Sequence, residues 1–149
     1  MRKITKEKIE SVLEVNVQEG TAFWKIRPRE YFETDRACST WNSRYAGERA
    51  GCKLQHGYVG VAIDNQRFLL HRIVWIVATG EEPLVIDHID GNPSNNRIEN
   101  LRNCSFSENS RNQKKSAANT SGITGIRFRK GVWEAYGKVN RKYFLFGFF

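Results

Sequence analysis

The sequence predicts an α+β protein, in which helices and short antiparallel strands follow one another along the chain. Two apolar runs on either side of Asp64-Asn65 predict a β-hairpin. A Ser-x-x-Glu capping box at Ser105 and Glu108 predicts the start of a helix, and the last thirty residues read as three short strands. With 149 residues, 40% of them hydrophobic, the chain can bury a core.

Residues 1–55 are expected to form an N-terminal extension that contains a helix and a strand. Thr5 is a plausible N-cap for a helix over residues 4–15, followed by a strand in residues 20–28 that ends near Pro28. The helical stripe consists of Ile4, Ile9, Val12 and Leu13. Residues 29–54 show no clear period, and we interpret them mainly as loop.

Residues 56–115 are expected to form the central domain. After the hairpin, Leu70, Ile73, Val74 and Val77 are spaced for the buried face of a helix that ends at Gly80, although their β-branched character leaves a strand open. The run "LVIDHIDGN" then predicts a strand followed by a turn at Asp90-Gly91. The capped helix should cover residues 106–115.

Residues 116–149 are expected to form a small sheet after the linker "SAANTSG". Its strands are 126–128, 132–139 and 143–146, with turns at Gly131 and Asn140-Arg141. Alternation places Arg127 and Arg129 on one face of the first strand. In the second strand, one face carries Glu134, Tyr136 and Lys138, and the opposite face carries Trp133, Ala135 and Val139.

The net charge of +8 lies almost entirely in the C-terminal third of the chain. From Arg102 onward there are ten Lys and Arg against two acidic residues, whereas residues 1–101 carry fourteen of each sign. A basic end on a neutral body predicts a polyanionic partner, most commonly nucleic acid. On charge alone, a merely soluble basic surface remains the alternative.

The segment after Asp87-His88 is rich in amides, with seven asparagines between Asn92 and Asn112. Hydrolysis of a phosphodiester needs a base for the attacking water and a Lewis acid for the developing charge. Neutral imidazole can accept a proton near pH 7, and carboxylate and amide oxygens suit a hard divalent ion. Because neighbouring strand residues project to opposite sides, His88 can serve as base while Asp87 binds metal. Spacing does not decide which asparagine orients the ring and which one completes the metal site.

These residues resemble the HNH nuclease motif. Asp87-His88 is followed by Asn100 after eleven intervening residues and by Asn109 after eight more, and "LLHRIVW", "DHIDGNPSNN" and "IENLRN" are similar to the HNH homing endonucleases of phages and mobile introns. The resemblance implies a ββα-metal (His-Me finger) core that holds one divalent cation, Mg²⁺ or Mn²⁺. It implies His88 as general base, Asn100 as the residue that orients His88, and Asp87 and Asn109 as metal ligands.

The tail is similar to the three-stranded sheet of plant ethylene-response-type DNA-binding domains, through "SGITGIRFRKGVWEAYGKV" and "YFLFGFF". In that family the sheet lies in the major groove of DNA. The sequence departs from the family because the packing helix that should follow the sheet is absent, which leaves the cover of the apolar face open; a structural sheet or dimer surface is the alternative. The DNA-binding residues that we expect are Arg111, Lys114, Lys115, Arg127, Arg129, Tyr136, Lys138 and Arg141.

The remaining polar residues of the central region are expected to have structural roles or to face solvent. Asn92, Asn95 and Asn96 suit turns that bond their own backbone. His71 is expected to be a packed, hydrogen-bonded structural residue, with an approach to a phosphate as the alternative. His56 is expected to be solvated, and the three widely spaced cysteines indicate neither a disulfide framework nor a zinc site.

Together these features predict a metal-dependent endonuclease that acts on double-stranded DNA, of the homing type. A catalytically degenerate DNA-binding or regulatory protein on the same fold is the main alternative, and an RNA-binding sheet protein is the third. No apolar run suggests a membrane span or a signal peptide, so we expect the protein in the cytoplasm of a bacterial or phage-infected cell. A homodimer is left open.

Overall fold

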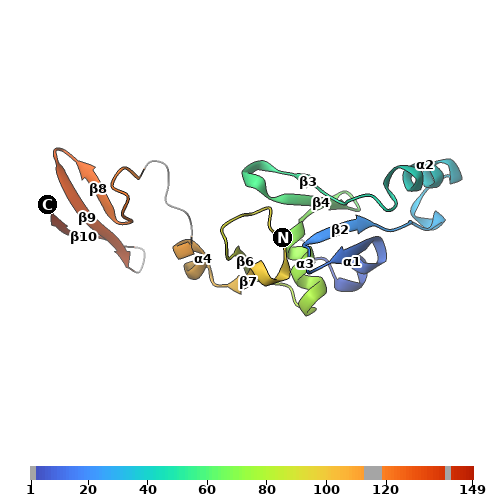
Figure 1. Cartoon of the computed structure of the whole chain (residues 1–149), viewed down its shortest axis with the longest axis horizontal. Helices are drawn as coiled ribbons and strands as arrows, with labels where there is room; N and C mark the ends of the chain where they lie inside the picture. The colour runs from blue at the N-terminus through green and yellow to red at the C-terminus, as the bar shows by residue number, and fades with distance from the viewer. Residues whose placement is uncertain (1–2, 113–118, 140–141) are drawn as a thin grey trace. The chain divides into compact units, whose positions relative to one another are not determined.

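The computed structural model describes residues 3–112, 119–139 and 142–149. The chain divides into two compact units, Met1–Asn112 and Gln113–Phe149, each of which is considered by itself (Figure 1). The predicted α+β class is confirmed, since helices alternate with small antiparallel sheets in the described part of the chain. The finer division of the first unit at residue 55 remains a prediction.

The N-terminus forms a short helix followed by a β-hairpin. Helix α1 (Lys6–Val12) begins at Thr5, whose side chain accepts a hydrogen bond from the Lys8 amide at 3.2 Å, as predicted. The helix was expected to continue to residue 15, but Leu13 already begins strand β1 (Leu13–Asn16), which pairs with β2 (Thr21–Trp24). Val15 and Val17 alternate with polar residues, so pairing with β2 overrides the helical stripe.

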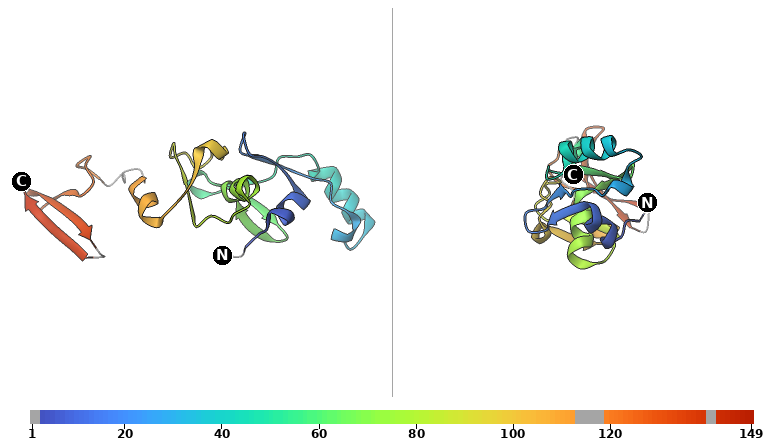
Figure 2. Two further views of the ribbon diagram at one scale, coloured as in Figure 1. Left: turned by 90° about the horizontal axis from the view of Figure 1, so that it is seen from below. Right: turned by 90° about the vertical axis from the view of Figure 1, so that its right-hand side faces the viewer.

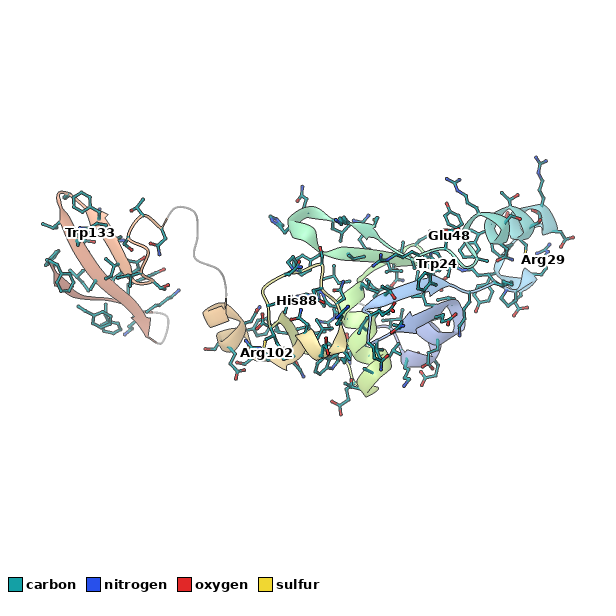
Figure 3. The ribbon with its side chains drawn as sticks, viewed as in Figure 1. Trp24, Arg29, Glu48, His88, Arg102 and Trp133 are labelled. Carbon is teal, nitrogen blue, oxygen red and sulfur yellow. The ribbon has the colours of Figure 1, made fainter. Side chains whose placement is uncertain are left out.

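An eleven-residue helix lies in the stretch that we interpreted as loop. The 3₁₀ turn η1 (Arg29–Tyr31) precedes α2 (Asp35–Tyr45), which is capped by the Thr34 side chain and buries none of its residues. Aromatic contacts attach it to the hairpin: Trp41 lies edge-on to Trp24, with ring centroids 5.7 Å apart. Trp24 is labelled in Figure 3. Without a buried face, α2 has no apolar periodicity to reveal it. Figures 1 and 2 show α2 at the end of this unit opposite α4 (Phe106–Asn112).

The hairpin and the central helix form as predicted. Strand β4 (Val59–Ile63) pairs antiparallel with β5 (Gln66–Leu69), and the turn between them carries Asp64 and Asn65, both at positive φ. On its other edge β4 pairs with the short strand β3 (Cys52–Lys53), which comes after α2 in the sequence. The 3₁₀ turn η2 (Gln55–Gly57) joins β3 to β4. Residues Leu70–Thr79 form helix α3, so the strand alternative for this segment is wrong. The helix ends at Gly80, whose φ is 77°.

The hydrophobic core of the first unit surrounds α3. Its largest fully buried side chains come from α1, β1, β4 and α3, and they include Ile9, Leu13, Val61, Ile63, Leu70, Ile73 and Val74. Leu101, from the start of β7 (Leu101–Cys104), joins this cluster. The strand pair that carries the candidate site is therefore anchored on the same core as the hairpin and α3.

The segment that follows has the ββα arrangement that the resemblance to HNH nucleases implied. Strand β6 (Val85–His88) pairs antiparallel with β7, which the sequence analysis did not predict, and the 3₁₀ turn η3 (Ile98–Asn100) leads into β7. Helix α4 then packs against β6. Its capping box is confirmed, because Glu108 accepts a hydrogen bond from the Ser105 amide at 2.8 Å, and the Glu108 amide donates to Ser105 Oγ at 3.2 Å.

The second unit contains the predicted three-stranded sheet, in the order β10-β9-β8. Strands β8 (Ile126–Arg129), β9 (Val132–Val139) and β10 (Lys142–Phe148) are antiparallel, and the first turn carries Lys130 and Gly131 at positive φ. On one face Arg127 lies opposite Glu134, and on the other Phe128 contacts Trp133, which is labelled in Figure 3. Strands β8 and β9 carry the expected faces, but β10 adds apolar side chains to the polar face, with Leu145 opposite Tyr136 and Phe148 opposite Glu134.

Candidate active site

Asp87 and His88 are the last two residues of β6, and both side chains are buried. His88 is 5% exposed and Asp87 is 8% exposed. Because successive strand residues project to opposite sides of the sheet, the two side chains enter different surroundings. His88 and Asp87 therefore lie on opposite sides of the sheet, as predicted for a general base and a metal ligand.

On its side of the sheet, Asp87 is held by Arg102 from the neighbouring strand. Arg102 lies directly opposite Asp87 in the β6–β7 register. Its Nε and Nη2 donate to Asp87 Oδ2 at 2.9 Å and 2.6 Å. Figure 3 shows Arg102 and His88 on this strand pair. The sequence alone does not indicate this contact, because the partner of a β-strand residue is known only once the second strand and its register are known.

The His88 ring contacts an amide on the loop between β6 and β7. Asn96, 3% exposed, has its Oδ1 3.3 Å from His88 Nε2, while its Nδ2 donates to the Ser94 carbonyl at 3.1 Å. An amide oxygen only accepts, so this contact requires the hydrogen on Nε2. The lone pair of the neutral ring then lies on Nδ1, where it can accept a proton.

Asn100, which we expected to orient His88, instead bonds the loop itself. Its Oδ1 accepts from the Asp90 amide at 3.0 Å, and its Nδ2 donates to Asp90 Oδ1 at 3.0 Å and to the Asn95 carbonyl at 2.9 Å. Its backbone carbonyl also accepts from the Ile89 amide at 2.9 Å. Asn96 therefore contacts the ring and also, as expected, bonds the loop backbone, whereas the Asn100 side chain closes the loop.

Asp90 is the centre of the hydrogen-bond network in this loop. Hydrogen bonds from the Asn95 side chain, the Asn92 amide and the Asn100 side chain lower the pKa of the Asp90 carboxyl to about 2. Asp90 is therefore ionised at neutral pH and holds both ends of the loop. Asn92 and Asn95 are turn residues, as predicted.

Separate replacement of the two asparagines distinguishes their roles. We expect Asn100→Ala to lower the free energy of unfolding by about 2–3 kcal/mol, because three side-chain hydrogen bonds are lost and their partners are left unpaired. We expect Asn96→Ala to lower any cleavage rate by about ten- to a hundredfold with a smaller loss of stability, since a misplaced base is ineffective. Urea unfolding and a plasmid nicking assay measure the two effects. If Asn100→Ala mainly lowers the cleavage rate and Asn96→Ala mainly lowers stability, Asn100 is the residue that orients His88.

Two further rings surround His88. His71, in the first turn of α3, lies edge-on to His88 with centroids 5.1 Å apart and an interplanar angle of 86°. Tyr58, just before β4, lies 5.5 Å from His71 and 6.0 Å from His88. Burial, followed by the charges of His88 and Arg72, lowers the pKa of His71 to about 3. His71 is packed, as expected, but its buried Nδ1 has no hydrogen-bond partner in the described part of the chain.

Asn109, the second predicted metal ligand, lies in α4, which packs against the strand that carries Asp87. Its half-buried side chain follows the capping box by one position. Carboxylate and amide oxygens are hard donors, which fits Mg²⁺ or Mn²⁺. Within residues 3–112, 119–139 and 142–149, no group of three or more His, Cys, Asp and Glu side chains is arranged for a metal. The ligand set of Asp87 and Asn109 remains a prediction.

The predicted DNA-binding residues of the second unit share the polar face of its sheet. Arg127 Nε donates to Glu134 Oε2 at 2.7 Å, and its guanidinium lies 4.9 Å from the Tyr136 ring centroid. Lys138 Nζ lies 5.1 Å from the ring centroid of Tyr143, and Arg129 is exposed. Lys114, Lys115 and Arg141 lie outside the described residues. Arg111 is in α4, but its side chain is outside the described part as well.

The comparisons with known proteins assign the central segment to a class. A family model described as HNH endonuclease matches residues 68–111. This range contains Asp87, His88, Asn100 and Asn109, and also His71, Asn96 and Arg102. The resemblance drawn from the sequence is therefore confirmed for this segment: residues 68–111 are of the HNH endonuclease type.

One curated relative and one solved structure are similar to parts of the chain. "Protein 3.8" of Escherichia phage T7 is 47% identical over 62 residues, which are 40% of this chain and 51% of that protein. The chain thus spans about half the length of this relative. A structure described as "DNA binding and cleavage by the HNH homing endonuclease I-HmuI" matches with a TM-score of 0.48 and 25% identity, over 76% of this chain and 57% of that one. Among the described residues, no helix is long and apolar enough to cross a membrane.

Proposed function

We propose that this protein is a metal-dependent endonuclease that hydrolyses phosphodiester bonds in double-stranded DNA, as a homing endonuclease of the HNH type. The observation that carries the proposal is the geometry around His88. A buried imidazole has one nitrogen at an amide oxygen, and a carboxylate lies on the opposite side of the same strand. Both lie within the HNH match.

In this proposal His88 is the general base. The hydrogen on Nε2 is engaged by Asn96 Oδ1, so Nδ1 accepts the proton of the water that attacks phosphorus. A neutral imidazole suits this step near pH 7. The ring beside it, His71, is neutral at that pH because its pKa is about 3, and it adds no positive charge that would oppose protonation of His88.

Asp87 and Asn109 would hold the divalent cation, Mg²⁺ or Mn²⁺. When bound, the ion supplies Lewis-acid stabilisation of the charge on the phosphate and on the leaving oxygen. Arg102 donates both hydrogen bonds to Asp87 Oδ2 and keeps the carboxylate oriented. With two protein ligands, substrate phosphate and water would complete the coordination shell.

A plasmid nicking assay tests the proposal. Supercoiled plasmid should be converted to nicked or linear DNA in Mg²⁺ or Mn²⁺, and EDTA should stop the reaction. DNA binding without cleavage under any of these conditions would overturn the enzymatic proposal and favour the alternative, a degenerate DNA-binding protein on the same fold. The assay separates the two because both bind DNA but only one cuts it.

We propose that the polar face of the C-terminal sheet contacts DNA through Arg127, Arg129, Tyr136 and Lys138. Arg129 is exposed, whereas the charge of Arg127 is shared with Glu134. We expect Arg129→Ala to reduce the slope of log affinity against log salt by about one counterion, and Arg127→Ala to reduce it by less. Fluorescence anisotropy with duplex DNA at several salt concentrations measures both.

The exposed Arg36 on α2 provides a matched control for these arginines. Arg36→Ala removes the same charge from a helix that we do not place on DNA, and it should leave the slope unchanged. If Arg129→Ala and Arg36→Ala have the same slope as the unaltered protein, the sheet does not contact phosphates.

A further inference from the structure

The structure places two rings beside His88, those of His71 and Tyr58, to which the proposed reaction gives no role. His88 comes from β6, His71 from α3 and Tyr58 from the chain before β4. Every pair of these rings has centroids within 6.0 Å, with interplanar angles of 58° to 86°. Tilted and edge-to-face arrangements at these separations are the favourable geometries of aromatic side chains.

The Asn96 contact alone does not fix the His88 ring. The χ2 torsion of a histidine is broad, so a ring held at one nitrogen can still swing about its Cβ–Cγ bond. His71 and Tyr58 limit that motion because each places a ring at a large angle to the His88 plane. The hydrogen bond determines which nitrogen is protonated, and the flanking rings determine where the other nitrogen points.

His71 is poorly explained as a residue that serves stability. It is 5% exposed, and its Nδ1 is buried without a hydrogen-bond partner among the residues that the structure describes. Burying a polar atom in this way is unfavourable, so an apolar side chain of similar size would be tolerated at least as well. No hydrogen bond to His88 is seen, and His71 therefore acts on His88 through ring contact.

We propose that His71 is a positioning residue of the nuclease site, which together with Tyr58 holds the plane of the His88 imidazole for proton transfer. The inference rests on the proposed endonuclease function. It assigns a role in the reaction to a residue outside the set Asp87, His88, Asn100 and Asn109. His71 itself touches neither the DNA nor the ion in this proposal.

The decisive variants are His71→Leu and His71→Phe. Leucine keeps apolar volume and removes the ring, so kcat for plasmid nicking should fall about ten- to a hundredfold with KM for DNA unchanged. Phenylalanine keeps a ring at the same place and should restore kcat to within about threefold of the unaltered protein. Thermal unfolding should show both variants to be at least as stable as the unaltered protein.

Trp75→Leu is the matched control. Trp75 lies one turn further along α3, packs against the core, and also has a buried ring nitrogen without a partner in the described part of the chain, but it is not one of the rings around His88. Its replacement should leave kcat unchanged. If Trp75→Leu lowers kcat as much as His71→Leu, or if His71→Phe does not restore it, the positioning role is overturned.

A spectroscopic measurement separates this inference from the proposed function. The chain has three histidines, so ¹⁵N-labelled ring signals of His88 can be resolved in the whole protein. The His88 ring signals should be sharp in the unaltered protein and in Trp75→Leu, and broadened by motion about the Cβ–Cγ bond in His71→Leu. If the protein does not cut DNA but this pattern is seen, the endonuclease proposal fails while the positioning contact stands. Unchanged His88 signals in His71→Leu would overturn the contact.

Discussion

His88→Ala is expected to reduce nicking of supercoiled plasmid by at least about a hundred- to ten-thousandfold, the usual contribution of a general base. The variant loses the only group that we assign to accept the proton of the attacking water. DNA affinity should stay within about twofold, because the 5% exposed ring contributes little surface to a DNA contact. Single-turnover nicking rates and binding by fluorescence anisotropy measure the two quantities.

His56→Asn is the appropriate control for His88→Ala. His56 is exposed in η2 and has φ of 63°, a backbone conformation that asparagine tolerates better than alanine does. This change removes an imidazole away from the site and should leave nicking intact. If His88→Ala cuts DNA as fast as the unaltered protein, His88 is not the general base. If His88→Ala and His56→Asn lose the same amount of nicking activity, the effect is nonspecific.

Asp87→Asn is expected to abolish cleavage at ordinary Mg²⁺ concentrations and to raise the Mn²⁺ concentration for half-maximal activity by more than about tenfold. The change removes the one carboxylate among the two proposed ligands, and an amide is a weaker ligand for a hard cation. DNA binding should be equal or slightly tighter, because one negative charge is lost. Mn²⁺ titrations followed by electron paramagnetic resonance, in the presence of DNA, measure binding independently of cleavage.

Asp64→Asn provides the charge-matched control for Asp87→Asn. Asp64 is exposed at the β4–β5 turn, where it pairs with Lys8 at 2.6 Å and has φ of 47°. Its replacement should not change the Mn²⁺ midpoint. Asn109→Ala should raise the midpoint in the same direction as Asp87→Asn. An unchanged Mn²⁺ midpoint in Asp87→Asn would contradict the assignment of Asp87 as a metal ligand. An unchanged midpoint in Asn109→Ala would contradict only the assignment of Asn109.

The elements predicted correctly from the sequence are those encoded by neighbouring residues. The capping box of Ser105 and Glu108, the turn at Asp64-Asn65 and the stop at Gly80 each act within a few positions along the chain. The pairing of β1 with β2 and the presence of β7 were missed because their strands are four residues long and their stability comes from partners elsewhere.

In the candidate site too, the sequence indicated which residues are involved but not which of them contact one another. The motif spacing directed attention to Asp87, His88, Asn100 and Asn109, and the HNH match covers all four. Spacing could not show that Asn96 contacts the ring while Asn100 closes the loop, because the two asparagines lie only four positions apart on one irregular segment. The path of the loop decides between them.

The sequence by itself therefore determined the α+β class and the Asp-His pair on opposite sides of one strand, since alternation and capping are local properties of the chain. The ββα core was implied by the resemblance to HNH nucleases, without the position of β7. Only the tertiary structure decided that Arg102 holds Asp87, that Asn96 holds one nitrogen of His88, and that His71 and Tyr58 flank its ring. These contacts join residues from β6, β7, the loop between them, α3 and the chain before β4, and their geometry depends on strand register and on packing around α3.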